Sequence, residues 1–165
     1  MAPGPGQRPP DLRSRFGALE EVFINDLIPM IDDTCRTIPD REHRAMAGLA
    51  TGVLQTFHIT LSHLDKSACP GGFSGTGGGF GGGTFDFKTA RNGVMADADA
   101  SNKKVKLAWL GTGTAEGERF DNSVKNYRDS LEKGGLKTVF YESPGTAYEW
   151  QTWRRCLCEF APLLF

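Results

Sequence analysis

The feature that most constrains the fold is a five-residue segment, Gly48-Leu49-Ala50-Thr51-Gly52, between an expected strand and an expected helix. Its spacing, G-x-A-x-G, is that of a sharp strand-to-helix turn whose G-x-S-x-G form carries a nucleophilic serine at its tip. We interpret both glycines as required by crowding, because a side chain at either place would clash. The residue at the tip is alanine, whose methyl group can neither attack nor donate a proton. The segment therefore predicts the geometry of a nucleophile without the nucleophile.

Chain length and net charge limit the classes of protein to which this chain can belong. A chain of 165 residues is one domain by the usual prior and buries roughly 70% of its unfolded surface. Its 19 basic and 20 acidic residues give a net charge of −1, which offers no electrostatic footprint for nucleic acid or an anionic membrane. No apolar run approaches the roughly 20 residues that a bilayer-spanning helix needs. We therefore expect neither a nucleic-acid partner nor a membrane.

The start of the chain is rich in proline and glycine. We expect a disordered leader over 1–11 and a single domain over 12–165. The leader lacks the basic region and apolar run of a signal peptide, which favours a cytoplasmic location unless the chain is a fragment of a secreted protein. In that compartment free thiols are expected for all four cysteines, which are Cys35, Cys69, Cys156 and Cys158.

Helical and extended patterns alternate along the chain. Helical periodicity covers 11–34, where Pro29 is expected to cause a kink. Further helices are expected over 51–64, 118–133 and 148–160, with a short one within 94–104. Strands are expected over 43–48, 68–74, 105–110 and 136–142, the second of them weakened by Pro70.

This alternation predicts parallel βαβ units and hence an α/β sandwich of three layers around a small, mostly parallel sheet. In such sheets functional residues gather in the loops at the carboxyl ends of the strands. Four of these loops are visible, beginning near Gly48, Ser74, Gly111 and Ser143.

Two other segments carry weaker motifs. Nine glycines occur within residues 71–83, so the match of Gly77–Gly82 to the dinucleotide-binding spacing G-x-G-x-x-G follows from glycine density, and a flexible loop is the expectation. Asp97 and Asp99 offer oxygen ligands of the kind that calcium prefers, but the rest of an EF-hand loop is absent from the sequence. We expect no cofactor, and a divalent cation is the alternative.

Four segments together carry a family resemblance. They are Ala45–Leu49, Gly72–Gly75, Trp109–Thr114 and, as the most specific, the motif from Tyr141 to Arg155. The chain over roughly residues 12–165 resembles the feruloyl and acetyl xylan esterases, within the esterase D and enterochelin esterase-like group of α/β-hydrolases. The resemblance implies hydrolysis of carbohydrate or phenolic carboxylic esters by a serine, an acid and a histidine in that chain order.

The resemblance places the three catalytic positions at Ala50, Glu116 and Tyr148. Alanine cannot attack an ester, and a phenol is a poor base at neutral pH. Glu116 would lack the imidazole that it should orient. Because replacing members of such a triad costs orders of magnitude in rate, we expect weak or no activity by the serine route.

Four residues are expected around the remaining pocket: Leu49, Thr51, Ser74 and Trp150. The backbone N–H of Thr51, at the start of a helix, is the expected oxyanion donor. Ser74 follows a strand, but the sequence offers it no base. Core packing is the expected main role of Trp150 and its neighbour Trp153, with stacking on a sugar or an aromatic acid as the alternative.

The histidines are not expected to supply the missing base. His43 begins the strand that precedes the turn, which is remote from the loops, and His58 and His63 lie on the following helix.

The resemblance covers only the C-terminal half of the esterase fold, which implies a truncated α/β-hydrolase-like sandwich. The strand before Ala50 is central in that family and here would have a bare edge, which seeks a partner. We therefore expect a homo-oligomer in which two such strands pair across a two-fold axis.

Two alternatives to an esterase stay open. One is a non-catalytic module that binds an ester, an acid or a lactone. The other is a metal-assisted ester or lactone hydrolase, in which an activated water is held by some of Asp86, Asp97, Asp99 and Glu116.

Overall fold

The computed structural model describes residues 12–76, 93 and 96–164. The chain forms two compact units, Met1–Pro39 and Asp40–Phe165, and each is described by itself. The expected leader, Gly77–Gly82 and Asp86 lie outside the described residues. A single domain over 12–165 stays a prediction.

The first unit is helical, as its periodicity predicts. It contains α1 (Leu12–Glu21), the π-helical segment η1 (Val22–Leu27) and α2 (Ile28–Thr34). Pro29 is the second residue of α2, directly after the π-helical segment, where the Ile28 N–H still bonds to Phe23 O. The interruption expected at Pro29 therefore lies at the junction between the π-helical segment and α2.

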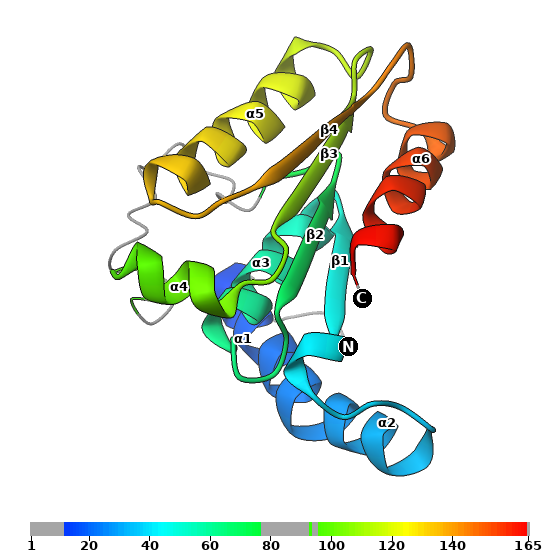
Figure 1. Ribbon diagram of the computed structural model, residues 1–165. Helices are drawn as coiled ribbons and strands as arrows, with labels where there is room; N and C mark the ends of the chain where they lie inside the picture. Colours follow the sequence, from blue (N-terminus) through cyan, green and yellow to red (C-terminus); the bar gives the residue numbers. More distant parts are fainter. Residues whose placement is uncertain (1–11, 77–92, 94–95, 165) are drawn as a thin grey trace, which may run out of the picture. The chain divides into compact units, whose positions relative to one another are not determined.

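The second unit is built around a parallel sheet of four strands in the order β1-β2-β3-β4 (Figure 1). The strands are β1 (Ala45–Leu49), β2 (Cys69–Phe73), β3 (Trp109–Gly113) and β4 (Val139–Ser143). Each neighbouring pair is parallel. Pro70 is tolerated in the central strand β2, where the pairing with β3 begins one residue later.

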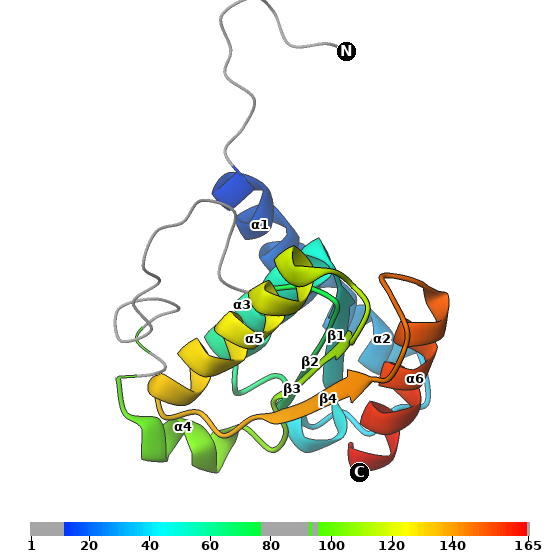
Figure 2. The ribbon, with the colours of Figure 1, turned by 90° about the horizontal axis from the view of Figure 1, so that it is seen from above.

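Helices cover both faces of this sheet, as Figure 2 shows from above. On one face lie α3 (Thr51–Ser62) and α5 (Glu118–Lys133), and on the other lies α6 (Trp150–Phe160). The unit also contains α4 (Ala98–Lys104) and the short 3₁₀ helices η2 (Arg41–His43) and η4 (Ala161–Leu163). The expected three-layer α/β arrangement is confirmed.

Each face of the sheet buries its own apolar cluster. Leu110 of β3 belongs to the cluster with Phe57 of α3 and Leu131 of α5. Its neighbour Trp109 belongs to the opposite cluster, with Phe160 of α6. The alternation follows from the two-residue repeat of a strand, so β3 is buried on both sides.

The third strand begins later than the predicted range of 105–110. The N–H of Val105 bonds to Ser101 O at 2.8 Å and ends α4, and the N–H of Lys106 bonds to Ala68 O at 2.9 Å. Val105 and Leu107 are buried although they precede the strand. The apolar run over 105–110 predicts a strand too early, because burial alone does not distinguish a strand from the segment that leads to it.

The fourth strand also begins later than the predicted 136–142, because the preceding helix ends through Leu136. The N–H of Leu136 bonds to Leu131 O at 3.0 Å, that of Gly135 bonds to Glu132 O at 2.9 Å, and Gly135 has φ +88°. This is a glycine-based helix end with a buried apolar residue after it. Leu136 therefore belongs to the end of the preceding helix and not to β4.

The remaining elements match their predictions with small shifts. The first strand begins at Ala45 instead of His43, which lies in η2, and α6 begins at Trp150 instead of Tyr148. None of the helices in the described part of the chain is long and apolar enough to cross a membrane.

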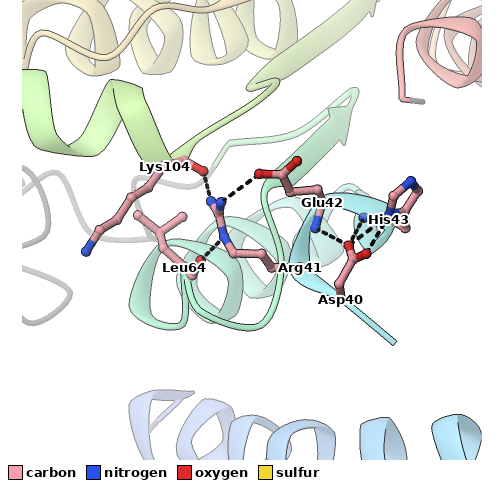
Figure 3. Close-up of polar contacts among 6 residues, drawn as sticks. All are labelled: Asp40, Arg41, Glu42, His43, Leu64 and Lys104. Carbon is pink, nitrogen blue, oxygen red and sulfur yellow. Dashed lines mark hydrogen bonds and ion pairs between the residues drawn. The ribbon is translucent and has the colours of Figure 1, made fainter. Parts of the chain in front are cut away.

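Arg41 ties the entrance of β1 to two helix ends (Figure 3). Its Nε donates to Leu64 O at 2.7 Å, just beyond α3, and its Nη2 donates to Lys104 O at the last residue of α4. Carbonyl groups at helix ends lack helical partners, and a cation there also interacts favourably with the helix dipole. Arg41 thus joins three segments of the second unit.

Asp40 caps the turn that presents Arg41. Its carboxylate accepts the backbone N–H groups of Glu42 and His43, each at 2.9 Å. The hydrogen bond from the His43 ring holds the pKa of Asp40 below its ordinary value. His43 is therefore engaged at the amino end of β1, away from the loops that follow the strands.

Replacing Arg41 should destabilise the second unit. We expect Arg41→Ala to lower the free energy of unfolding by about 1.5–3 kcal/mol, because hydrogen bonds from a charged group are lost. Urea denaturation measures this value. The exposed Lys103→Ala, on the same helix as Lys104, should stay within about 0.5 kcal/mol of the wild type. Equal stabilities of the two variants would contradict the role of Arg41.

Candidate functional site

The turn between β1 and α3 has the strained geometry that its spacing predicts. Ala50 precedes α3 with φ 55° and ψ −116°, a conformation that is unfavourable for a residue with a side chain. Its N–H bonds to Phe73 O at 3.1 Å, which fixes the turn beside the end of β2. Ala50 is one of two non-glycine residues with positive φ in the described part of the chain, and the other is Ser74.

Steric crowding requires glycine at only one of the two glycine positions of the motif. A Cβ added at Gly48 would lie 2.1 Å from Gly52 O, so only glycine fits there. A Cβ added at Gly52 would meet nothing within 4 Å beyond its own helix and chain neighbours. The expectation that a side chain at Gly52 would clash is therefore wrong, and the crowding involves the backbone carbonyl of Gly52.

A third glycine, Gly75, closes the turn from the segment that follows β2. A Cβ added at Gly75 would lie 2.3 Å from Ala50 O and 2.8 Å from Ala50 Cα. The backbone at Gly75 therefore packs directly against the tip of the turn. This contact brings Ser74, the residue before it, to the neighbourhood of Ala50.

Glu116 lies in the loop after β3 and is only 8% exposed. Its Oε1 accepts the backbone N–H of Gly113 at 2.8 Å and the hydroxyl of Ser74. Its Oε2 is buried and accepts no hydrogen bond from any residue that the structure describes. The expectation that Ser74 lacks a base in view is wrong, because a carboxyl group is its direct partner.

Aromatic residues connect this pair to position 148. The indole N–H of Trp153 donates to Ser74 Oγ at 3.1 Å. The Tyr148 ring packs edge-on against Trp153, with 5.0 Å between the ring centroids. Ser74 and Trp153 thus link the acid position Glu116 with the base position Tyr148, while Gly75 links them with Ala50.

A groove lies between α6 and the ends of β1 and β2. Its volume is about 760 Å³, within the range of small-molecule pockets. The lining is mainly apolar, and Leu49, Phe73, Trp150, Trp153 and Leu157 contribute to it. Because Trp153 also bonds to Ser74, the groove adjoins the polar pair.

Trp150 and Trp153 differ in their surroundings. Trp150 is 80% exposed, so the expected core packing is wrong for this residue. Its side chain lines the groove, and its role there stays a prediction. Trp153 is half-buried and packs against the cluster on the α6 face. Thr51, the expected oxyanion donor, is exposed at the first residue of α3, and its role stays a prediction.

The described carboxylates do not gather around a metal. Asp97 caps α4 by accepting Ala100 N–H at 3.0 Å. Asn102 bonds to Gly135 O at 2.6 Å and to Lys137 N–H at 2.9 Å, which docks α4 onto the segment before β4. Among the described residues no group of three or more His, Cys, Asp or Glu side chains could hold a metal ion.

The four cysteines are free, as expected. Cys156 of α6 is buried, while Cys158, two residues on, is exposed. Burial and, second, the negative charge of Glu116 raise the pKa of Cys156 to about 12. Its thiol therefore stays protonated at neutral pH and is a poor nucleophile.

Comparison with known proteins supports the esterase resemblance. No family model matches the chain. The chain is 37% identical over 147 residues to an endo-1,4-beta-xylanase/feruloyl esterase of Xylanibacter ruminicola. This match covers 88% of the chain and 18% of that protein.

Solved structures show the same fold. A ferulic acid esterase from Anaeromyces mucronatus, in complex with ferulic acid, has a TM-score of 0.68 and 18% identity, over 96% of this chain and 60% of the other. A serine-to-alanine mutant of the feruloyl esterase module from Clostridium thermocellum, complexed with sinapinate, has a TM-score of 0.70 and 19% identity, over 91% and 59%. The resemblance and the partial α/β-hydrolase-like fold are confirmed, and the chain spans about 60% of these esterases.

The strain at Ala50 gives a testable consequence. We expect Ala50→Gly to raise the free energy of unfolding by up to about 1 kcal/mol, because glycine adopts positive φ without a steric cost. Ala47→Gly, in the extended part of β1, should lower it by a similar amount. Thermal denaturation of both variants measures the difference, and a loss of stability in Ala50→Gly would contradict the strained geometry.

Proposed function

We propose that this chain, which resembles part of the feruloyl esterases in sequence and fold, is an ester-hydrolase relative without serine-type turnover. In this proposal Ala50 stands at the nucleophile position, Tyr148 at the base position and Glu116 at the acid position. The expected ligand is a carboxylic ester of a phenolic or carbohydrate compound, or the acid derived from it. The chain itself would hydrolyse such esters weakly or not at all by the serine route.

The observation that carries this proposal is the conformation of Ala50. A strained backbone at the tip of a strand-to-helix turn is what a nucleophilic serine requires to stand clear of the sheet. Strain of this kind is kept where the surrounding structure imposes it, and here Gly48 and Gly75 impose it through backbone contacts. The turn is thus suited to a nucleophile, and alanine supplies none.

A ligand-binding module is the second candidate, and one observation favours it. Glu116 Oε2 is buried without a donor among the described residues, which costs free energy until a donor is supplied. The adjoining groove has two tryptophans, on which an aromatic acid could stack. The mutant esterase complexed with sinapinate is a precedent for ligand binding by a feruloyl esterase module that carries a serine-to-alanine substitution.

Restoring the two missing groups tests the proposal. We expect Ala50→Ser combined with Tyr148→His to raise hydrolysis of nitrophenyl acetate and methyl ferulate at least about 100-fold over the native chain. Each single change should stay near the native rate, because triad members act as a unit. Adding Glu116→Gln to the double variant should remove most of the gain. Turnover by the native chain that matches the double variant would contradict the proposal.

A chelator separates the alternatives in the same assay. Native turnover that EDTA abolishes would support the metal-assisted hydrolase. Saturable binding of ferulate without turnover, measured by calorimetry, would support the binding module.

Self-association through β1 is a further part of the proposal. Within the described sheet β1 is an edge strand, its residues Ala45–Leu49 carry no charge, and open apolar edges favour pairing. The groove beside it exposes Trp150 and Leu157. In the proposed dimer two copies of β1 pair antiparallel across a two-fold axis.

A charge in β1 should prevent this pairing. We expect the native chain to sediment as a dimer at micromolar concentration and Ala47→Lys to shift it to monomer, because an inserted lysine blocks edge pairing. Val139→Lys, on the outer strand β4 at the other edge, is the matched control and should leave the dimer intact. A native monomer in sedimentation velocity would overturn the proposed dimer.

A further inference from the structure

Ser74 lies at the centre of a buried polar network. Its side chain is 1% exposed, donates to Glu116 Oε1 and accepts the Trp153 indole N–H at 3.1 Å. Its backbone N–H bonds to Gly111 O at 2.8 Å. The hydroxyl is therefore used both as a donor and as an acceptor, and the main chain that carries it is fixed to β3.

The backbone of Ser74 is strained as well. Its φ of 48° lies in the left-handed region that residues with side chains rarely adopt. A glycine at this place would remove the strain but also the hydroxyl. Strained residues that persist in a fold cluster at functional sites, so the hydroxyl of Ser74 is a candidate for function.

The hydrogen bonds of Glu116 are distributed unevenly over its two oxygens. Oε1 accepts from Ser74 and from the N–H of Gly113, whereas Oε2 accepts from no described residue. With two donors on the same oxygen, rotation of the carboxyl group would break both bonds. These two donors therefore fix Oε1 as the bonded oxygen of Glu116 and leave Oε2 without a donor among the described residues.

We propose that Ser74 is a positioning residue that holds Glu116 so that Oε2, which is buried, is the oxygen left to accept a hydrogen bond from a donor placed beside it. The inference rests on the function proposed above only for the identity of that donor, which is an N–H or O–H group of a bound ligand, or the imidazole introduced by Tyr148→His. Trp153 supports Ser74 by occupying its acceptor capacity, so that the hydroxyl proton points to Glu116.

Two substitutions separate positioning from stability. Ser74→Ala and Ser74→Gly both remove the hydroxyl, but only Ser74→Gly relieves the positive φ. We expect the glycine variant to be the more stable one, while both lose the positioning effect to the same extent. Ser101→Ala is the control, since Ser101 is a buried serine whose hydroxyl bonds to Asp97 O at 2.9 Å, in α4.

The first readout needs no catalytic activity. In NMR spectra of the otherwise native chain, both Ser74 variants should shift the side-chain carboxyl ¹³C resonance of Glu116 and move the indole N–H resonance of Trp153 upfield, because a hydrogen bond is lost at each. Ser101→Ala should leave both resonances in place. If the Ser74 variants leave them in place too, the proposal is overturned.

The second readout uses the Ala50→Ser, Tyr148→His variant. Adding Ser74→Ala or Ser74→Gly should lower kcat by about 10- to 100-fold, the loss that follows a small misplacement of a catalytic group, with little change in KM. A kcat loss that follows stability, larger for alanine than for glycine, would overturn the proposal. Should that parent variant prove inactive, the proposed function fails while the NMR readout still decides the role of Ser74.

Discussion

The geometry of the site depends on a backbone contact between β1 and α3. At Gly48 the strand runs so close to the first turn of the helix that any Cβ would overlap the carbonyl of Gly52. The chain must therefore reverse within a few atoms, and Ala50 takes the strained conformation that results. The segment after β2 packs Gly75 against the same turn. Main-chain packing alone thus decides where the tip of the turn lies.

A buried hydrogen-bond network joins the layers of the sandwich. Ser74 comes from the end of β2, Glu116 from the loop after β3 and Trp153 from α6 on the far face of the sheet. Their hydrogen bonds need all three elements to be in place, because each residue lies on a different one. A buried carboxyl group is costly unless it is hydrogen-bonded, so this network also restricts how α6 packs on the sheet.

The sequence predicted the features that arise from local patterns. Alternating apolar periodicities gave the order of strands and helices, and the G-x-A-x-G spacing gave the turn at Ala50. It did not predict the pairing of Ser74 with Glu116, because a positive φ at a serine has no signature in the sequence. Nor did it distinguish Trp150 from Trp153, which lie three positions apart on one helix but differ in burial. The strands β3 and β4 begin later than the apolar pattern predicts, because buried residues such as Leu107 and Leu136 lie before the strand pairing begins.

The backbone origin of the turn has a consequence for how such a chain changes over generations. The close contacts that shape residue 50 join main-chain atoms: a Cβ at Gly48 would overlap Gly52 O, and a Cβ at Gly75 would overlap Ala50 O. An exchange of serine and alanine at this place should then change the free energy of unfolding little, so selection for stability hardly distinguishes the two residues. A serine can therefore be lost from this turn while the turn keeps its geometry, and it can return there, but in the proposed function it acts as a nucleophile only together with a histidine at position 148.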